Sequence, residues 1–127
     1  MIDHVVLTVR DVERSAAFYK EALAPLGHVN VVSYDGHPGH AALHGLGDAG
    51  ETYLLLKRGR PAPKAVHVAF AAKSKKAVDA FHRAAMSAGG RDNGPPGARK
   101  HYFSGYYAAY ALDPDGYNIE AVFQSRR

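Results

Sequence analysis

The sequence has 127 residues and contains no cysteine. This length suits one domain with a buried core, and 46% hydrophobic against 22% charged residues is typical of a globular chain. Without cysteine there is no disulfide, thiolate metal site or cysteine nucleophile, so any metal must bind through His, Asp, Glu or Tyr. No apolar run approaches the roughly 20 residues that cross a bilayer, and the start lacks a signal peptide, so we expect a cytoplasmic protein with no membrane partner.

The charge gives a weaker indication of partners. The 16 Lys and Arg residues exceed the 12 Asp and Glu residues, a balance that suits nucleic acid or an anionic small molecule. The basic residues are scattered in short groups, such as 57–64 and 73–76, which favours solvated surface. No G-x-G-x-x-G, P-loop or G-x-S-x-G motif is present. We therefore expect a small-molecule partner and no nucleic acid.

An internal repeat organises the chain. A shift of 63 residues lays the segment 3–27 over the segment 66–90, so that His4 falls on His67. Each segment begins with a short apolar run and continues with apolar residues spaced three and four apart. This pattern is typical of a strand followed by a helix that buries one face against a sheet.

Both predicted helices carry the expected signals at their ends. Asp11 and Ser74 are good N-cap residues and occupy equivalent positions of the repeat. Gly27 ends the first helix, and Gly89 and Gly90 end the second. Each repeat is therefore predicted to be a strand and a capped helix, with further strands to follow.

Strand-like pieces separated by turn residues follow each helix. The tetrapeptide 113–116 (DPDG) has Pro second and Gly fourth, as a type I turn prefers. The stretch 93–101 (NGPPGARKH) is the longest irregular segment and is predicted to be a mobile loop over a site. The sequence thus predicts one α+β domain over 1–127, with two βαβββ modules at about 1–60 and about 64–125. The predicted strands after the helices are 28–34, 40–46, 52–57, a loose 91–103, 105–112 and 117–123.

Three residues form a candidate metal site. His4 and His67 share one position of the repeat, so two related strands place their imidazoles on equivalent faces. Glu120 lies in an apolar strand, where a divalent cation would offset the cost of burying a carboxylate. Two histidines and one carboxylate suit an open-faced metal site. The alternative is that the histidines are hydrogen-bonded core residues and that Glu120 faces solvent on an edge strand.

The segments 3–23, 67–72 and 113–122 resemble the vicinal oxygen chelate superfamily. This superfamily includes glyoxalase I, extradiol dioxygenases, fosfomycin resistance enzymes, methylmalonyl-CoA epimerase and bleomycin resistance proteins. The resemblance spans nearly all of the chain. It implies paired βαβββ modules that curl into an open cup, and a homodimer, because the family often completes its cups across two chains.

The resemblance also implies a ligand set. A divalent metal ion (Fe, Mn, Ni or Zn) would bind His4, His67 and Glu120, which match three ligand positions of the family. The fourth position does not match, because aligning 50–57 with 116–123 places Leu54 opposite Glu120, and leucine cannot bind a metal. Three ligands are more similar to extradiol dioxygenases and fosfomycin resistance enzymes than to glyoxalase I.

A different register of the first module would change the fourth position. In one interpretation, a register shifted by one residue brings in Glu51 or Tyr53 in place of Leu54. The other interpretation is that the protein keeps three ligands.

Substrate contacts are expected from the loop after residue 98 and from the strand that follows it. As hypotheses, a loop imidazole or phenol contacts substrate or relays a proton, and a loop cation meets an anionic group. The alternative is that the tyrosines are core aromatics and that the cations are solvated. The candidates for catalysis are Glu120, His101 and Tyr102, and those for substrate binding are Arg99, Lys100, Tyr106 and Tyr110.

A second histidine cluster comprises His37, His40 and His44. Only Asp35 or Asp48 is near enough in the sequence to complete a metal site there. We therefore expect these histidines to lie on polar surface.

The function predicted from these features is that of a glyoxalase-like enzyme. A divalent metal would act as a Lewis acid on a small substrate chelated through vicinal oxygens, with lyase, transferase or dioxygenase chemistry. The alternative is a metal-free protein that sequesters a ligand, similar to bleomycin resistance proteins, which generally lose the metal ligands. A third interpretation is a pure interaction domain, in which replacing His4 and His67 by Ala has little effect on ligand or metal binding.

Overall fold

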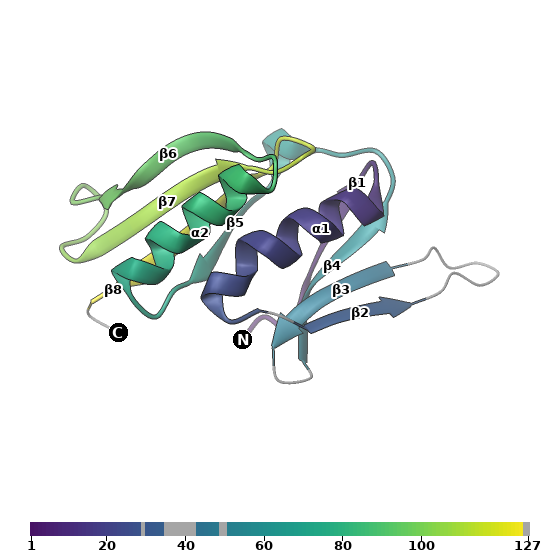
Figure 1. Ribbon diagram of the computed structural model, residues 1–127, viewed down its shortest axis with the longest axis horizontal. Helices are drawn as coiled ribbons and strands as arrows, with labels where there is room; N and C mark the ends of the chain where they lie inside the picture. Colours follow the sequence, from purple (N-terminus) through teal and green to yellow (C-terminus); the bar gives the residue numbers. More distant parts are fainter. Residues whose placement is uncertain (29, 35–42, 49–50, 126–127) are drawn as a thin grey trace.

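The computed structural model describes residues 1–28, 30–34, 43–48 and 51–125. In this part of the chain, no helix is long and apolar enough to cross a membrane. Two βαβββ units follow one another (Figure 1). The first contains β1 (Val5–Val9), α1 (Val12–Leu23), the 3-10 helix η1 (Ala24–Leu26), β2 (Asn30–Tyr34), β3 (Leu43–Asp48) and β4 (Glu51–Arg58). After the 3-10 helix η2 (Pro63–Ala65), the second contains β5 (His67–Ala71), α2 (Lys75–Ser87), β6 (Arg91–Ala98), β7 (Tyr106–Leu112) and β8 (Asn118–Gln124).

Each unit forms its own four-stranded sheet with the same topology. The strand orders are β1-β4-β3-β2 and β5-β8-β7-β6. In each sheet the first strand runs parallel to the last, and the other neighbours are antiparallel. The two helices lie side by side, and each packs against strands of its own sheet (Figure 1). The predicted fold class, α+β with two βαβββ modules in one chain, is confirmed.

The helix ends are those that the sequence predicts. The side chains of Asp11 and Ser74 each accept a hydrogen bond from the backbone N–H three residues later, as N-caps do. Gly27 and Gly89 have φ of 91° and 94°, a left-handed conformation that glycine adopts without steric cost. The repeat is therefore preserved in local backbone chemistry as well as in strand order.

One hydrophobic core joins the two modules. Phe18 and Tyr19 of α1 and Phe81 of α2 are all buried in it. They belong to the same cluster as Leu56 of β4 and Ile119 of β8. Because one contiguous cluster contains residues of both sheets and both helices, the modules pack as a single body.

The turn between β7 and β8 fastens the second module to the first. The turn predicted at 113–116 is present, with the Gly116 N–H donating to the Asp113 carbonyl at 3.0 Å. The Asp113 carboxylate accepts a 2.5 Å hydrogen bond from the hydroxyl of Tyr19 on α1. The hydroxyl of Tyr117 donates to the carbonyl of Thr8 on β1 at 2.6 Å. Burial, and then the charge of Asp113, raise the pKa of Tyr19, so this phenol stays a donor.

The mobile loop predicted at 93–101 is wrong for most of its length. Residues 93–98 belong to β6, which pairs antiparallel with β7. Pro95 and Pro96 are tolerated because they lie between the paired residues Gly94 and Gly97 of an edge strand, where neither missing N–H removes a ladder hydrogen bond. The register shifts on both sides of Gly94, as expected of bulges. The irregular sequence therefore forms a bulged edge.

Candidate functional site

The pleat of the second sheet sorts its side chains onto two faces. On β8, Ile119 is buried in the core on the side of α2, so its neighbour Glu120 points to the opposite side. The strand register aligns Glu120 with Tyr110 of β7 and with Ala69 of β5. His67 is two residues before Ala69 and shares its side. We call this side of the sheet, away from α2, the open face.

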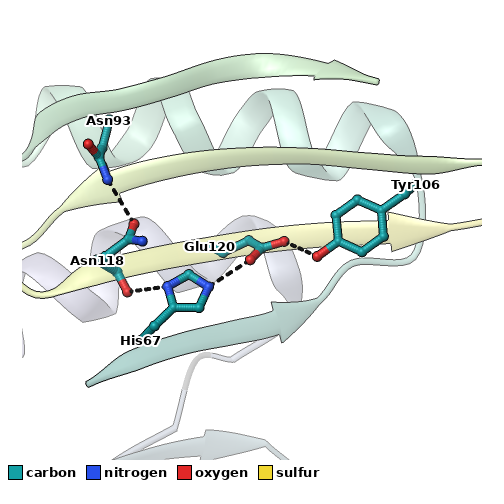
Figure 2. A network of polar contacts seen from close by, with 5 residues as sticks. All are labelled: His67, Asn93, Tyr106, Asn118 and Glu120. Atoms are coloured by element: carbon teal, nitrogen blue, oxygen red, sulfur yellow. Dashed lines mark hydrogen bonds and ion pairs between the residues drawn. The ribbon is translucent and has the colours of Figure 1, made fainter. Parts of the chain in front are cut away.

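His67 and Glu120 meet on the open face (Figure 2). Nε2 of His67 lies 2.8 Å from Oε1 of Glu120, and the side chains are 45% and 4% exposed, respectively. The interpretation of Glu120 as a solvent-facing edge residue is wrong, because β8 lies between β5 and β7. The expectation that this carboxylate needs a partner is confirmed, since hydrogen bonds to it offset the cost of its burial.

The protonation of His67 follows from its second contact. Nδ1 lies 3.1 Å from the backbone carbonyl oxygen of Asn118, which can only accept a hydrogen bond. Nδ1 therefore carries a proton, and the Nε2 of a neutral ring presents a lone pair to the Glu120 carboxylate. Two lone pairs at 2.8 Å repel each other, so the contact needs a cation, which is either a proton or a metal ion. A histidine whose other ring nitrogen donates to a carbonyl is the usual arrangement of a metal ligand.

Two tyrosines complete the surroundings of Glu120. The hydroxyl of Tyr106 donates to Oε2 of the carboxylate (Figure 2). Burial, and then this hydrogen bond, raise the pKa of Tyr106. Burial, and then the charge of Glu120, raise the pKa of Tyr110 to about 12. The Tyr110 ring is stacked near His67, with centroids 6.2 Å apart. Both phenols keep their protons at neutral pH, and Tyr106 holds one carboxylate oxygen in place.

Two asparagines belong to the same network and were missed in the sequence. Asn118 supplies the carbonyl for His67, and its side-chain oxygen accepts a 3.0 Å hydrogen bond from Nδ2 of Asn93 on β6 (Figure 2). Strand alternation could have found Asn118, because it precedes Glu120 by two residues and so shares its face. Asn93 carries no such signal, because the loop predicted at 93–101 leaves the face of its side chain undefined.

His4 lies in the segment just before β1 rather than within the strand. Its Nδ1 is 2.6 Å from Oδ1 of Asp3. A cavity of about 420 Å³, in the size range of ligand pockets, is lined by both His4 and His67 together with Tyr53 and Phe70. Among the residues that the structure describes, no group of three His, Asp or Glu side chains is placed to hold a metal ion. The structure thus joins His67 to Glu120 and places His4 on the wall of the adjoining cavity.

The counterpart of Glu120 in the first module is Leu55, not Leu54. The parallel pairs are Val6 with Leu55 and Ala69 with Glu120, and the repeat lays Val6 on Ala69. Leu54 is buried in the core on the other face. The alignment by sequence was off by one residue, because a shift of one residue along a strand exchanges its two faces.

The corrected register does not bring a carboxylate to the fourth position. Tyr53 is the counterpart of Asn118, and Glu51 is exposed at the start of β4, where its carboxylate accepts a 3.4 Å hydrogen bond from the Tyr53 hydroxyl. Leucine therefore occupies the fourth position of this chain.

The loop candidates lie near the open face. Tyr102 is 52% exposed, with its ring 5.1 Å from that of Tyr106 and 4.2 Å from that of His101. The guanidinium of Arg99 lies over the ring of Tyr110, 5.4 Å from its centroid. These aromatic contacts connect the turn to the strands of the site. Arg99, Lys100, His101 and Tyr102 lie directly after β6, at the start of the turn that leads to β7, and Lys100 and His101 are exposed.

Of the second histidine cluster, only His44 falls within the described residues. His37, His40 and Asp35 lie outside them. His44 is on β3 and half-buried, and burial lowers its pKa. The prediction that this cluster lies on polar surface is wrong for His44, which is partly enclosed.

His28 lies between the two modules, a place that its sequence context did not predict. Its ring is 5.7 Å from that of Tyr53 on β4 and 5.9 Å from that of Phe70 on β5. Burial is the main cause that lowers its pKa. Tyr53 and Phe70 also line the cavity, so His28 contacts two residues of the cavity wall.

Comparison with known proteins assigns this architecture to a family. The family model of the Glyoxalase/Bleomycin resistance protein/Dioxygenase superfamily matches residues 1–121. The chain therefore belongs to this superfamily, as its sequence motifs predict. No curated protein sequence matches the chain.

Solved structures agree with this membership. The chain is 30% identical to a glyoxalase/bleomycin resistance protein from Albidiferax ferrireducens T118, with a TM-score of 0.77 and coverage of 97% and 98% of the two chains. It is 26% identical to the V278E mutant of glyoxalase I from Zea mays, with a TM-score of 0.69, covering 96% of this chain and 45% of that one. A Frankia domain of the same superfamily, 21% identical over 98% and 97% of the chains with a TM-score of 0.73, shares the fold.

Proposed function

We propose that this protein is a glyoxalase-like enzyme that uses a divalent metal ion, Fe, Mn, Ni or Zn, on a small substrate with two neighbouring oxygens. The observation that supports this most is the pair of His67 and Glu120 on the open face. Their adjacent nitrogen and oxygen are donor types that such metals accept, and the Asn118 carbonyl holds the imidazole in the ligating tautomer.

The proposed ligands are His67, Glu120 and, across the cavity, His4. A bound metal ion would supply a Lewis acid that polarises the substrate oxygens. The side chains of the protein itself bind the substrate and orient the metal ligands. Tyr106 holds Oε2 of Glu120 by a hydrogen bond and keeps its proton. A lyase, transferase or dioxygenase reaction is compatible with this arrangement.

We also propose that the protein is a homodimer in the cytoplasm. The segment that carries His4 exposes two apolar side chains, Ile2 (79%) and Val6 (46%), and a second copy of the chain would cover them. Sedimentation equilibrium is expected to give twice the chain mass of 13.7 kDa. A monomer at all concentrations would contradict the dimer but not the metal site.

A metal-free ligand-binding protein is the second candidate. Leu55 favours it, because the position equivalent to Glu120 in the first module carries no donor. The intact pair of His67 and Glu120 favours the enzyme.

The test is elemental analysis of the untagged protein purified without chelator, beside Glu120→Gln and the matched control Leu55→Gln. We expect about one equivalent of metal in the wild type and in Leu55→Gln. Glu120→Gln should bind the metal more than about 100-fold more weakly, because loss of a direct ligand costs more than loss of a supporting group. A wild type that binds no metal even after addition would contradict the enzyme and favour the binding protein.

A further inference from the structure

The bulged edge strand β6 holds one cation in a fixed place beside the site. The Nη2 of Arg99 donates a 2.7 Å hydrogen bond to the carbonyl of Pro95, four residues earlier. Its guanidinium also lies over the ring of Tyr110, 5.4 Å from the centroid. Arginine side chains are long and usually mobile, but these two contacts, one with β6 and one with β7, hold Arg99 in one position.

Two glycines make room for this arrangement. A Cβ on Gly97 would lie 2.9 Å from Nη1 of Arg99, and one on Gly94 would lie 2.8 Å from Cδ2 of Tyr110. Gly94 also has φ of 152°, which side-chain-bearing residues rarely adopt. The sequence from Gly94 to Gly97 therefore forms a shallow seat that the guanidinium approaches closely.

The seated guanidinium is not neutralised within the described part of the chain. None of the ion pairs there includes Arg99, and its one hydrogen-bond acceptor is the Pro95 carbonyl. A guanidinium has five N–H donors in a planar fork that matches carboxylate and phosphate oxygens. Most of these donors therefore remain for a ligand, although Arg99 is only partly exposed.

The ring of Tyr110 lies against both Arg99 and one of the proposed metal ligands. Tyr110 stacks near His67, with 6.2 Å between the centroids, and contacts Arg99 through its face. Tyr110 is also the cross-strand neighbour of Glu120. Arg99 and His67 therefore both contact the ring of Tyr110, and a small molecule with neighbouring oxygens at His67 and Glu120 would extend past this ring to reach Arg99.

From this seat we infer that the substrate is a small organic anion, and that Arg99 binds its carboxylate or phosphate group while its other oxygens face His67 and Glu120. The inference rests on the proposed function, because it concerns the substrate of the same face. It also selects Arg99 over its neighbour Lys100 as the cation that binds the substrate. Contacts with Pro95 and Tyr110 position Arg99, whereas Lys100 is exposed.

The test measures binding of benzoate, phenyl phosphate and uncharged benzamide to the full chain by NMR titration, after EDTA has removed any metal and has itself been removed by dialysis. The carboxylate then cannot bind through a metal, so the result does not depend on the metal site, and no EDTA carboxylate competes for Arg99. The variants are Arg99→Gln, Gly97→Ala and the matched control Arg91→Gln. Gly97→Ala keeps the charge but pushes the flexible end of Arg99 from its seat, and Arg91 is an exposed arginine at the other end of β6.

The expected result is that benzoate or phenyl phosphate binds more tightly than benzamide, with the tighter one identifying the oxyanion. Arg99→Gln should weaken binding of that anion about tenfold, as loss of a charged hydrogen bond predicts, and Gly97→Ala about threefold. Arg91→Gln should change it less than about twofold. Spectra of each variant show whether it is folded.

Two results would overturn the inference. One is that benzamide binds as tightly as both anions. The other is that folded Arg99→Gln and Arg91→Gln bind the anion alike. A protein that takes up no metal but binds the anion through Arg99 would contradict the proposed function alone, whereas metal uptake without anion binding would contradict this inference alone.

Discussion

The two modules are alike on the side of the helices and different on the opposite side. Asp11 and Ser74 cap equivalent helices, and both sheets have one strand order. On the opposite side, the second module carries Glu120 and Asn118, where the first carries Leu55 and Tyr53. The helix side must pack one shared core, so its pattern is constrained in both copies. The other side is free to differ, and the polar chemistry is concentrated in the second module.

The histidine position is an exception to this difference, because both modules carry a histidine there. His4 and His67 are equivalent by the repeat, yet His67 contacts Glu120 and Asn118 while His4 contacts Asp3. The same residue thus has a buried carboxylate partner in one module and an exposed one in the other. The surroundings of each copy, more than the histidine itself, decide what it can do.

The largest effect on stability is expected where the modules meet. Tyr19 and His82 are equivalent by the repeat, and each contacts an aspartate, Asp113 and Asp92 respectively. Tyr19→Phe should lower the free energy of unfolding by about 1 to 3 kcal/mol, because it leaves a buried carboxylate with one donor fewer. His82→Phe should cost about 0 to 1 kcal/mol, since Asp92 is 55% exposed. Urea unfolding measures both, and equal losses would contradict the role of the buried contact.

A smaller effect is expected on metal binding when Glu120 loses its support. Tyr106→Phe removes the hydroxyl that holds Oε2, and the metal should bind about tenfold more weakly, as is usual for a group that orients a ligand. Tyr107→Phe is the control, because Tyr107 faces α2 and its hydroxyl donates to Asp79 at 2.7 Å. Isothermal titration with Zn²⁺ distinguishes them. If Tyr107→Phe weakened binding as much, the two faces would not differ as described.

The smallest effect should be the same in both modules. Asp11→Ala and Ser74→Ala each remove one N-cap hydrogen bond, so each should lower the free energy of unfolding by about 1 kcal/mol. Thermal unfolding of both variants, with Ser87→Ala as an exposed control on α2, measures this. A difference of more than about 1 kcal/mol between the two caps would show that the helix sides are less alike than their sequence suggests.

The sequence predicts those features that depend on local chemistry. The caps at Asp11 and Ser74, the glycine helix ends and the strand with buried Glu120 all follow from short patterns, and the structure contains them. The edge strand β6 is predicted only as a loose piece at 91–103 that overlaps a predicted loop, because prolines and glycines favour loops, while their tolerance at a sheet edge depends on which strands pair.

The remaining features depend on tertiary contacts. Leu55 replaced Leu54 as the counterpart of Glu120 because the face of a strand residue is fixed by pairing with β1. The seat of Arg99 requires Tyr110 of β7 to lie against β6, which no local pattern contains.

The most direct test of the metal site in the second module is a ¹H–¹⁵N NMR spectrum recorded with substoichiometric Mn²⁺. The paramagnetic ion broadens the signals of amides near it. We predict that the signals of His67, Asn118 and Glu120 broaden first, and that those of Leu55 and its neighbours on β4 broaden less. Broadening centred on β4, or spread evenly over exposed carboxylates, would contradict the account.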